Sequence, residues 1–140
     1  MRISAKAQNA CIALLELARS YQDGQPVRIR TIAEAHGISP RFLVQILQQL
    51  KGAGFVISTR GASGGYRLAM SPDEIDLASI LRLVDGPLEM FLEPAAPPAS
   101  RVLREAWQEV AEAETRMLSA ISLADLAERL DAQPQAMYFI

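Results

Sequence analysis

The sequence predicts a mainly α-helical fold with one small β-hairpin, arranged as a winged helix-turn-helix domain followed by a long helix. Three observations lead to this prediction. Two short amphipathic segments meet at Gly37. A glycine-rich segment with an apolar run on each side follows directly, as in a hairpin. One long amphipathic segment then occupies most of the C-terminal part of the chain.

The first helix is expected over residues 5–21, with Ser4 as its cap and Asp23-Gly24 after its end. Ser4 and Lys6 stand at the positive end of this helix, where backbone N–H groups can bind a phosphate; a simple helix cap explains them equally well. Cys11 lies on the apolar stripe of the helix, and we interpret it as a packing residue rather than a redox sensor.

A helix, a tight turn and a second helix are expected within residues 27–50. Gly37 supplies the positive φ that such a turn needs, and Ser39 followed by Pro40 is a typical helix start. We interpret the only histidine, His36, as a helix-end residue rather than a ligand or a pH switch. The inward stripe of the second helix consists of Leu43, Ile46, Leu47 and Leu50, and its outer faces carry Arg41, Gln45, Gln48 and Gln49.

A hairpin is expected next, from Phe55 through a glycine-rich turn to Leu68. Arg60 precedes the turn and Arg67 follows it, so a loop this small could approach a phosphate backbone or place an arginine in a minor groove. Each residue alone also suits an ordinary solvated surface, but their order favours DNA binding. The candidate DNA-contacting residues are Ser4, Lys6, Arg28, Ser39, Arg41, Phe42, Gln45, Gln49, Arg60, Gly61, Ser63, Gly64, Tyr66 and Arg67.

Charge is distributed unevenly along the chain. The net charge is −2, yet residues 1–67 hold nine Lys or Arg against three Asp or Glu, whereas residues 68–140 hold five against thirteen. The basic part coincides with the predicted helix-turn-helix and hairpin, as the electrostatic footprint of a DNA-binding surface should. We expect the acidic part to face away from the duplex.

The remaining chain is predicted to contain three helices. Ser71 should start a fourth helix that ends at Gly86-Pro87, a proline-rich loop should cover residues 87–99, and a long helix should run from about residue 100 to 120. Ser122 and Asp125 have capping-box spacing for a short last helix. We therefore divide the chain into a winged helix-turn-helix domain (1–86), a loop (87–99) and a dimerisation helix with the C-terminal helix and tail (100–140).

The long helix carries an apolar stripe that a small domain has little core left to cover. Packing within one subunit is one explanation, but contact with a second copy is favoured, since DNA-binding domains of this kind usually act as symmetric pairs. The predicted dimer contacts are Leu103, Trp107, Val110, Met117 and Ile121.

Composition excludes several classes of protein. Half of the 140 residues are apolar, which argues against disorder. No apolar run is long enough for a membrane helix and no signal-peptide pattern is present, so a cytoplasmic protein without membrane contact is expected. One His, one Cys and no suitable carboxylate cluster leave no nucleophile and base to propose, which argues against an enzyme.

The chain resembles the Rrf-two family of bacterial regulators over nearly its whole length. The most specific match is Arg60-Gly61 with Gly64-Gly65-Tyr66-Arg67-Leu68. The other matching positions are residues 1–6, 13–18, 32–33, 37–40, 43, 46–47, 50, 53–54, 56 and 58. The resemblance implies a dimeric winged-helix transcription factor that reads a palindromic operator with the helix after Ser39 and inserts the Arg60 wing into the minor groove.

The sequence departs from the family in the segment that several members use for an iron–sulfur cluster. Those members supply three cysteines between the fourth helix and the dimer helix, whereas this chain has none there. The window offers only Glu89, Glu93 and Glu105, and such clusters require thiolates. We therefore expect no cluster, no metal and no cofactor. Asn9 and Ile12 also differ from residues common in the family's first helix.

These observations favour a sequence-specific transcriptional regulator that binds double-stranded DNA as a homodimer. Repression is favoured over activation because occupancy of an operator is sufficient for it. With a cluster excluded, the resemblance suggests three routes for the signal: a small molecule at the dimer interface near the proline-rich loop, a protein partner such as a metabolic enzyme, or the protein's own concentration. The alternative is a winged-helix module for protein–protein interaction that uses the acidic half, and salt-sensitive duplex binding would separate the two.

Overall fold

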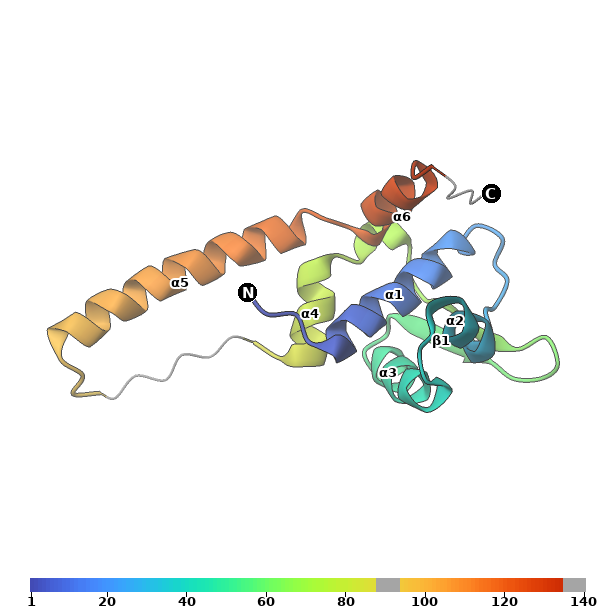
Figure 1. Cartoon of the computed structure of the whole chain (residues 1–140), viewed down its shortest axis with the longest axis horizontal. Helices are drawn as coiled ribbons and strands as arrows, with labels where there is room; N and C mark the ends of the chain where they lie inside the picture. Colours follow the sequence, from blue (N-terminus) through green and yellow to red (C-terminus); the bar gives the residue numbers. More distant parts are fainter. Residues whose placement is uncertain (88–93, 135–140) are drawn as a thin grey trace, which may run out of the picture.

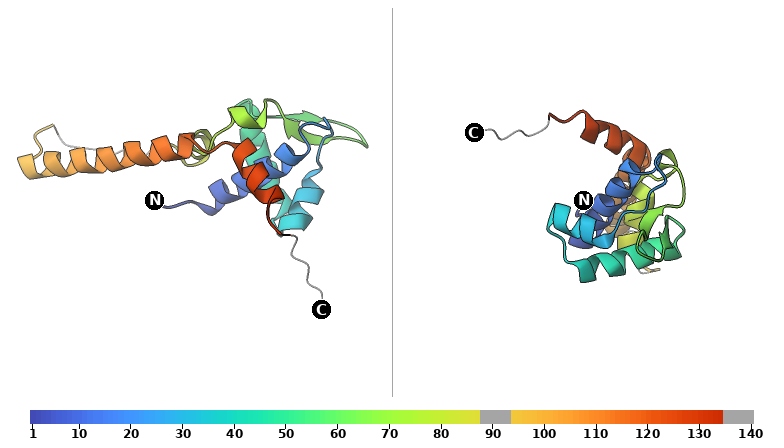
Figure 2. Two further views of the ribbon diagram at one scale, coloured as in Figure 1. Left: turned by 90° about the horizontal axis from the view of Figure 1, so that it is seen from above. Right: turned by 90° about the vertical axis from the view of Figure 1, so that its right-hand side faces the viewer.

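The computed structural model describes residues 1–87 and 94–134. In chain order its elements are α1 (Ala5–Arg19), α2 (Ile29–His36), α3 (Pro40–Gly52), β1 (Val56–Thr59), β2 (Gly65–Leu68), η1 (Pro72–Glu74), α4 (Leu77–Asp85), α5 (Pro98–Ser119) and α6 (Leu123–Asp131). A compact head contains most of them, and α5 projects from this head as an arm (Figures 1 and 2). The fold is mainly helical with one two-stranded antiparallel hairpin, as predicted. None of the described helices is long and apolar enough to cross a membrane.

Helix α1 lies at the centre of the head and contacts α3, α4, α6 and β2 (Figure 1). Its buried stripe combines small residues such as Ala10 and Ala13 with Leu14 and Leu17. Small side chains allow neighbouring helices to approach closely, and the leucines fill the space between them. The buried stripe of α3, which is Leu43, Ile46, Leu47 and Leu50, completes this core as the sequence predicted.

Helices α2 and α3 form the predicted helix-turn-helix. Gly37 closes α2 with a φ of 63°, a left-handed conformation that a side chain disfavours. The Ser39 hydroxyl accepts a hydrogen bond from the backbone N–H of Phe42 at 3.5 Å and starts α3. His36 Nε2 lies 2.9 Å from Glu16 Oε1 and ties the end of α2 to α1. This contact agrees with a structural role for His36.

The hairpin pairs Val56 with Leu68 at its base and Thr59 with Gly65 at its tip. A third segment joins this small sheet, because Val27 and Tyr66 exchange two backbone hydrogen bonds of 2.7 and 2.8 Å. The approach is close, since a Cβ on Gly65 would lie 2.5 Å from the Val27 carbonyl oxygen. The hairpin is thereby attached directly to the segment that enters α2.

The fourth helix starts later than predicted. Residues 72–74 form a separate 3₁₀ turn, Ile75 is extended, and Asp76 caps α4 by accepting a hydrogen bond from the Ser79 N–H at 2.9 Å. Ser71 therefore caps no α-helix. The reason is long-range, since the extended Ile75 is buried and its carbonyl accepts a hydrogen bond from the N–H of Leu123 at 2.8 Å.

The grouping of α6 with the long helix is also corrected. Leu123 is fully buried in the core of the head, and α6 packs on α1 (Figure 2). The Leu77 N–H donates to the Ile121 carbonyl at 3.0 Å, which fixes the turn between α5 and α6 to the start of α4. Helix α6 is therefore part of the head, and α5 alone forms the arm. The C-terminal tail, residues 135–140, lies outside the described residues.

Candidate nucleic-acid interface

The exposed face of α3 carries Arg41, Gln45 and Gln48, spaced four and three residues apart. This spacing brings the three side chains to one side of the helix, opposite the buried leucines. An Arg guanidinium and two side-chain amides supply hydrogen-bond donors and acceptors suited to the edges of bases in a major groove. The free face of α3 can therefore read a duplex.

Two predicted contact residues on α3 also make contacts within the protein. The Gln49 amide donates a hydrogen bond to the Leu83 carbonyl of α4 at 3.0 Å. Phe42 is half-buried against the core. Both residues lie on the flank of α3 that faces the rest of the head. Helical periodicity alone does not predict which flank of α3 is covered. Gln48, which the candidate set omitted, takes the outward position.

The hairpin tip is exposed at Arg60, Gly61 and Ser63, and Arg67 is exposed on β2. Gly64 and Tyr66, which are also predicted contacts, have a structural role in the hairpin. Gly64 is buried, and a Cβ there would lie 2.2 Å from the Thr59 carbonyl oxygen. Tyr66 is half-buried against the core and uses its backbone to pair with Val27. These two residues therefore shape the hairpin and present little surface of their own.

At the start of α1, the Ser4 hydroxyl accepts a hydrogen bond from the Ala7 N–H at 3.0 Å and donates one to Asp85 at 2.5 Å. Its two partners explain Ser4 as a cap that also joins α1 to α4. Lys6 is half-buried. Arg28 is exposed immediately before α2, next to the backbone pairing of Val27 with the hairpin.

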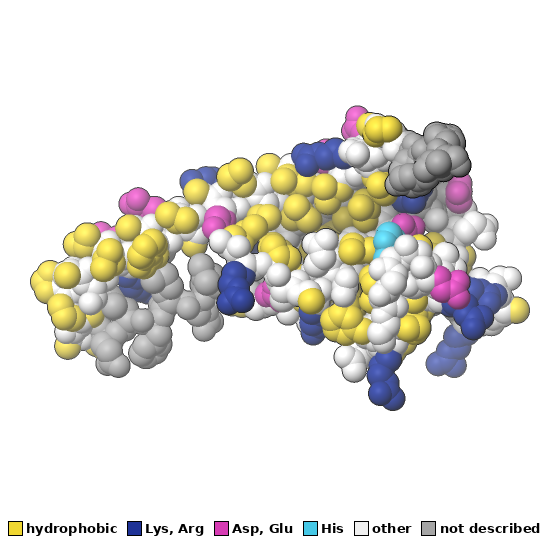
Figure 3. Space-filling model, in the orientation of Figure 1, with side chains coloured by type: hydrophobic (Ala, Val, Ile, Leu, Met, Phe, Trp, Pro, Cys, Tyr) yellow, Lys and Arg dark blue, Asp and Glu magenta, His cyan; other side chains and the backbone are white. Residues whose placement is uncertain are grey.

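Basic side chains gather where α2, α3 and the hairpin meet, at the lower right of Figure 3. Within the described parts of the chain, none of Arg28, Arg41, Arg60 and Arg67 forms an ion pair with a carboxylate. Lys51, which the sequence analysis missed, ends α3 and donates a hydrogen bond to Ser58 of β1 at 2.8 Å. The position of Lys51 in the last turn of α3 could have identified it from the sequence. The interface thus offers guanidinium groups that no carboxylate of residues 1–87 or 94–134 neutralises.

An exposed apolar stripe runs along α5, which has no buried residue. Large side chains on it are strongly exposed: Trp107 by 53%, Val110 by 54% and Met117 by 72%. Yellow side chains mark this arm in Figure 3. Leu103 belongs to the same stripe, but Ile121 lies past the end of α5 in the turn to α6 and is only half-exposed. Ile121 is therefore better described as a residue of that turn.

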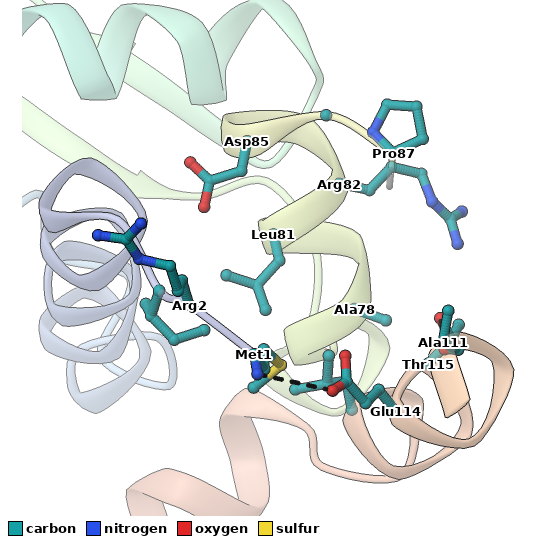
Figure 4. A pocket seen from close by; sticks show the side chains of 13 residues that line it. Met1, Arg2, Ala78, Leu81, Arg82, Asp85, Pro87, Ala111, Glu114 and Thr115 are labelled. Carbon is teal, nitrogen blue, oxygen red and sulfur yellow. Dashed lines mark hydrogen bonds and ion pairs between the residues drawn. The ribbon is translucent and has the colours of Figure 1, made fainter. Parts of the chain in front are cut away.

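A pocket of about 560 Å³ lies between the N-terminal segment, α4 and α5. Leu81 points into it, whereas Arg2 and Arg82 extend in opposite directions (Figure 4). The amino group of Met1 lies 3.8 Å from Glu114 on α5. Because the two guanidinium groups diverge, they form no joint anion site in this pocket, whose lining mixes apolar residues with charged ones such as Asp85 and Glu114.

Comparison with known proteins places these features in one family. The sequence profile of Rrf2, described as an iron-dependent transcriptional regulator, matches residues 3–129. The chain belongs to the Rrf2 family. The transcriptional regulator CymR of Bacillus subtilis is 34% identical over 99% of both chains. The solved structure of CymR, the global cysteine regulator of B. subtilis, superposes with a TM-score of 0.81 at 32% identity, covering 92% of this chain and 98% of that one. The T. potens IscR structure gives a TM-score of 0.78 at 32% identity, with 99% and 93% coverage.

As an Rrf2 protein, the chain is a DNA-binding, helix-turn-helix transcriptional regulator, and the relatives carry the names of regulators rather than of enzymes. The family description mentions iron, but the residues of this chain do not supply the ligands that an iron–sulfur cluster needs. The chain has one cysteine, and Fe–S clusters are held mainly by thiolates. That cysteine, Cys11, is half-buried on α1, and burial together with the nearby Asp85 raises the pKa of its thiol to about 11. Glu89 and Glu93, two of the three carboxylates in the window where some members of the family hold a cluster, lie outside the described residues.

Proposed function

We propose that this Rrf2 regulator binds a palindromic operator as a homodimer and represses transcription by occupying it. The observation that carries the proposal is the exposed polar face of α3, which stands beside a hairpin whose arginines have no carboxylate partner among the described residues. Helix α3 would lie in the major groove, with Arg41, Gln45 and Gln48 toward base edges. Contacts between the surrounding basic residues and phosphates would hold α3 in this position in the groove.

The hairpin would contact the adjacent minor groove. Arg60 stands at its tip directly after β1, and the turn that follows is built of small residues. A narrow A·T-rich minor groove concentrates negative potential and attracts an inserted arginine. Arg28, Ser39, Lys51 and Arg67 surround the two groove contacts and are assigned to the phosphate backbone.

Homodimerisation is inferred from α5. A contiguous apolar stripe on an exposed helix of 22 residues requires a partner to be stable in water. A second copy offers an identical stripe, and two-fold pairing of two DNA-binding heads calls for a palindrome. Repression follows most simply, because a dimer bound across a promoter blocks access without any further contact. An effector would act at the pocket lined by α4 and α5, since both the head and the dimer arm border it.

The test is selection of duplexes from a random, unmethylated library by the purified protein, followed by binding measurements over a series of salt concentrations. One enriched palindrome is expected, with an affinity that falls steeply as salt rises, because each neutralised phosphate releases counterions. Loss of transcription in a purified promoter assay would then establish repression. Absence of any enriched duplex would overturn the proposal and favour the protein-interaction module.

A further inference from the structure

One partly exposed apolar side chain on α3 lies outside the core cluster of the described residues. Val44 lies between the exposed residues Arg41 and Gln48, three positions after the first and four before the second. It is only partly buried, and it is not among the partly buried apolar residues that pack against the core in the described chain. Phe42, on the opposite flank of the same helix, does pack there.

The surroundings of Val44 place it at the reading surface. Lys51 lies two turns further along the same flank, and it bonds Ser58 of the hairpin. Gln49 marks the other flank, which is bonded to α4 through Leu83. Val44 is therefore on the side of α3 that faces the hairpin, next to the exposed polar face and away from α4.

A major groove presents hydrogen-bonding groups and one apolar group, the C5-methyl of thymine. Valine can neither donate nor accept a hydrogen bond, so it can gain free energy there only by covering that methyl. We propose that Val44 is a specificity-determining residue that contacts the C5-methyl group of one thymine in each operator half-site. The inference rests on the proposed function, because it requires α3 to lie in the major groove.

The experiment uses the palindrome selected by the wild-type protein from unmethylated DNA, in which thymine is the only base with this methyl. Each thymine is replaced in turn by deoxyuridine, symmetrically in both half-sites, and the dissociation constant is measured. We expect one position at which loss of the methyl weakens binding by about fourfold per half-site, the factor for exposing one methyl group. At that position, Val44→Ala should bind the thymine and deoxyuridine duplexes equally.

Gln45→Ala is the matched control, because it removes a neighbouring polar side chain from the same helix and should keep the sensitivity to the methyl. Thermal unfolding of both variants verifies that they are folded. Binding of the palindrome without any methyl-sensitive thymine would overturn the Val44 contact and leave the proposed function intact. The same conclusion would follow if Val44→Ala retained the full sensitivity. Failure of the wild-type protein to select any duplex would overturn both.

Discussion

Arg60 is the residue whose side chain tests the hairpin contact most directly. Replacement by alanine should weaken operator binding most where the flanking sequence is A·T-rich, because a narrow minor groove has the strongest negative potential. Binding constants on operators with A·T-rich and G·C-rich flanks measure this. Arg129→Ala removes an equal charge from α6 and should affect both operators little. An equal loss on both flanks for Arg60→Ala would refute the minor-groove assignment.

Glycine is needed at position 64 because no side chain fits there, and not because the backbone adopts a conformation that favours glycine. A Cβ would meet the Thr59 carbonyl oxygen at 2.2 Å and the Gly61 carbonyl oxygen at 2.9 Å, so Gly64→Ala must open the turn. We expect a loss of about 1–3 kcal/mol in the free energy of unfolding, the usual range for overpacking. Chemical denaturation measures it. Gly52→Ala, where a Cβ meets nothing within 4 Å, should be neutral or stabilising. Equal stability of the two variants would contradict the steric argument.

The thiol of Cys11 should make the free energy of unfolding depend on pH in the alkaline range. Burial raises the pKa of its thiol from 9.0 to about 11, so between these values the folded protein retains a proton that the unfolded chain loses. The free energy of unfolding contributed by this group therefore falls as pH rises from about 9 to 11. Denaturation curves across this range should show a smaller fall for Cys11→Ala than for the wild-type protein. Parallel curves would show that the thiol ionises alike in both states.

At the scale of single elements, α6 shows how a helix is fixed by both local and distant residues. Ser122 and Asp125 form the capping box that the sequence predicted, with hydrogen bonds of 3.0 Å in both directions. The hydrogen bonds from Ser122 lower the pKa of the exposed Asp125 carboxyl. The capping box specifies where the helix begins, but burial of Leu123 specifies where it packs.

Leu123→Ala should lower the free energy of unfolding of the DNA-binding head by about 2–5 kcal/mol, because it leaves a cavity in the core where α6 packs against α1 and the segment of Ile75. Denaturation monitored by circular dichroism measures the loss. Leu130→Ala, at a position 37% exposed on the same helix, is the matched control and should cost much less. A small effect at Leu123 would mean that α6 is not part of the cooperative unit.

At the scale of the whole molecule, the head and the arm carry different kinds of surface. The head holds the basic surface of α3 and the hairpin, whereas α5 projects from it and carries the exposed apolar stripe (Figure 2). The net charge of −2 is the sum of a basic part, residues 1–67, and acidic residues spread over η1, α4, α5 and α6.

Trp107→Ala should shift the protein toward monomer, since a large aromatic side chain at the middle of an apolar interface typically dominates its energy. We expect the dimer dissociation constant to rise about 10- to 100-fold. Sedimentation at a series of low concentrations measures it. Glu109→Ala, two residues away on α5, should leave the dimer in place. An unchanged dimer in Trp107→Ala would place the subunit contact elsewhere.

The sequence by itself determined the features that depend on neighbours within a turn or two. Examples are the start of α3 at Ser39-Pro40, the left-handed Gly37, the buried leucine stripe and the capping box of α6. Capping and helical periodicity are local, so their signals can be read from adjacent residues.

Only the tertiary structure decided which of several local options the chain adopts. Ser71 and Asp76 are both acceptable caps, and burial of Ile75 beside Leu123 selects Asp76. Gln48 and Gln49 are adjacent glutamines on one helix, and the carbonyl of Leu83, 34 residues away, engages the second. These choices depend on partners that are distant in the sequence, and such partners become neighbours only when the core forms.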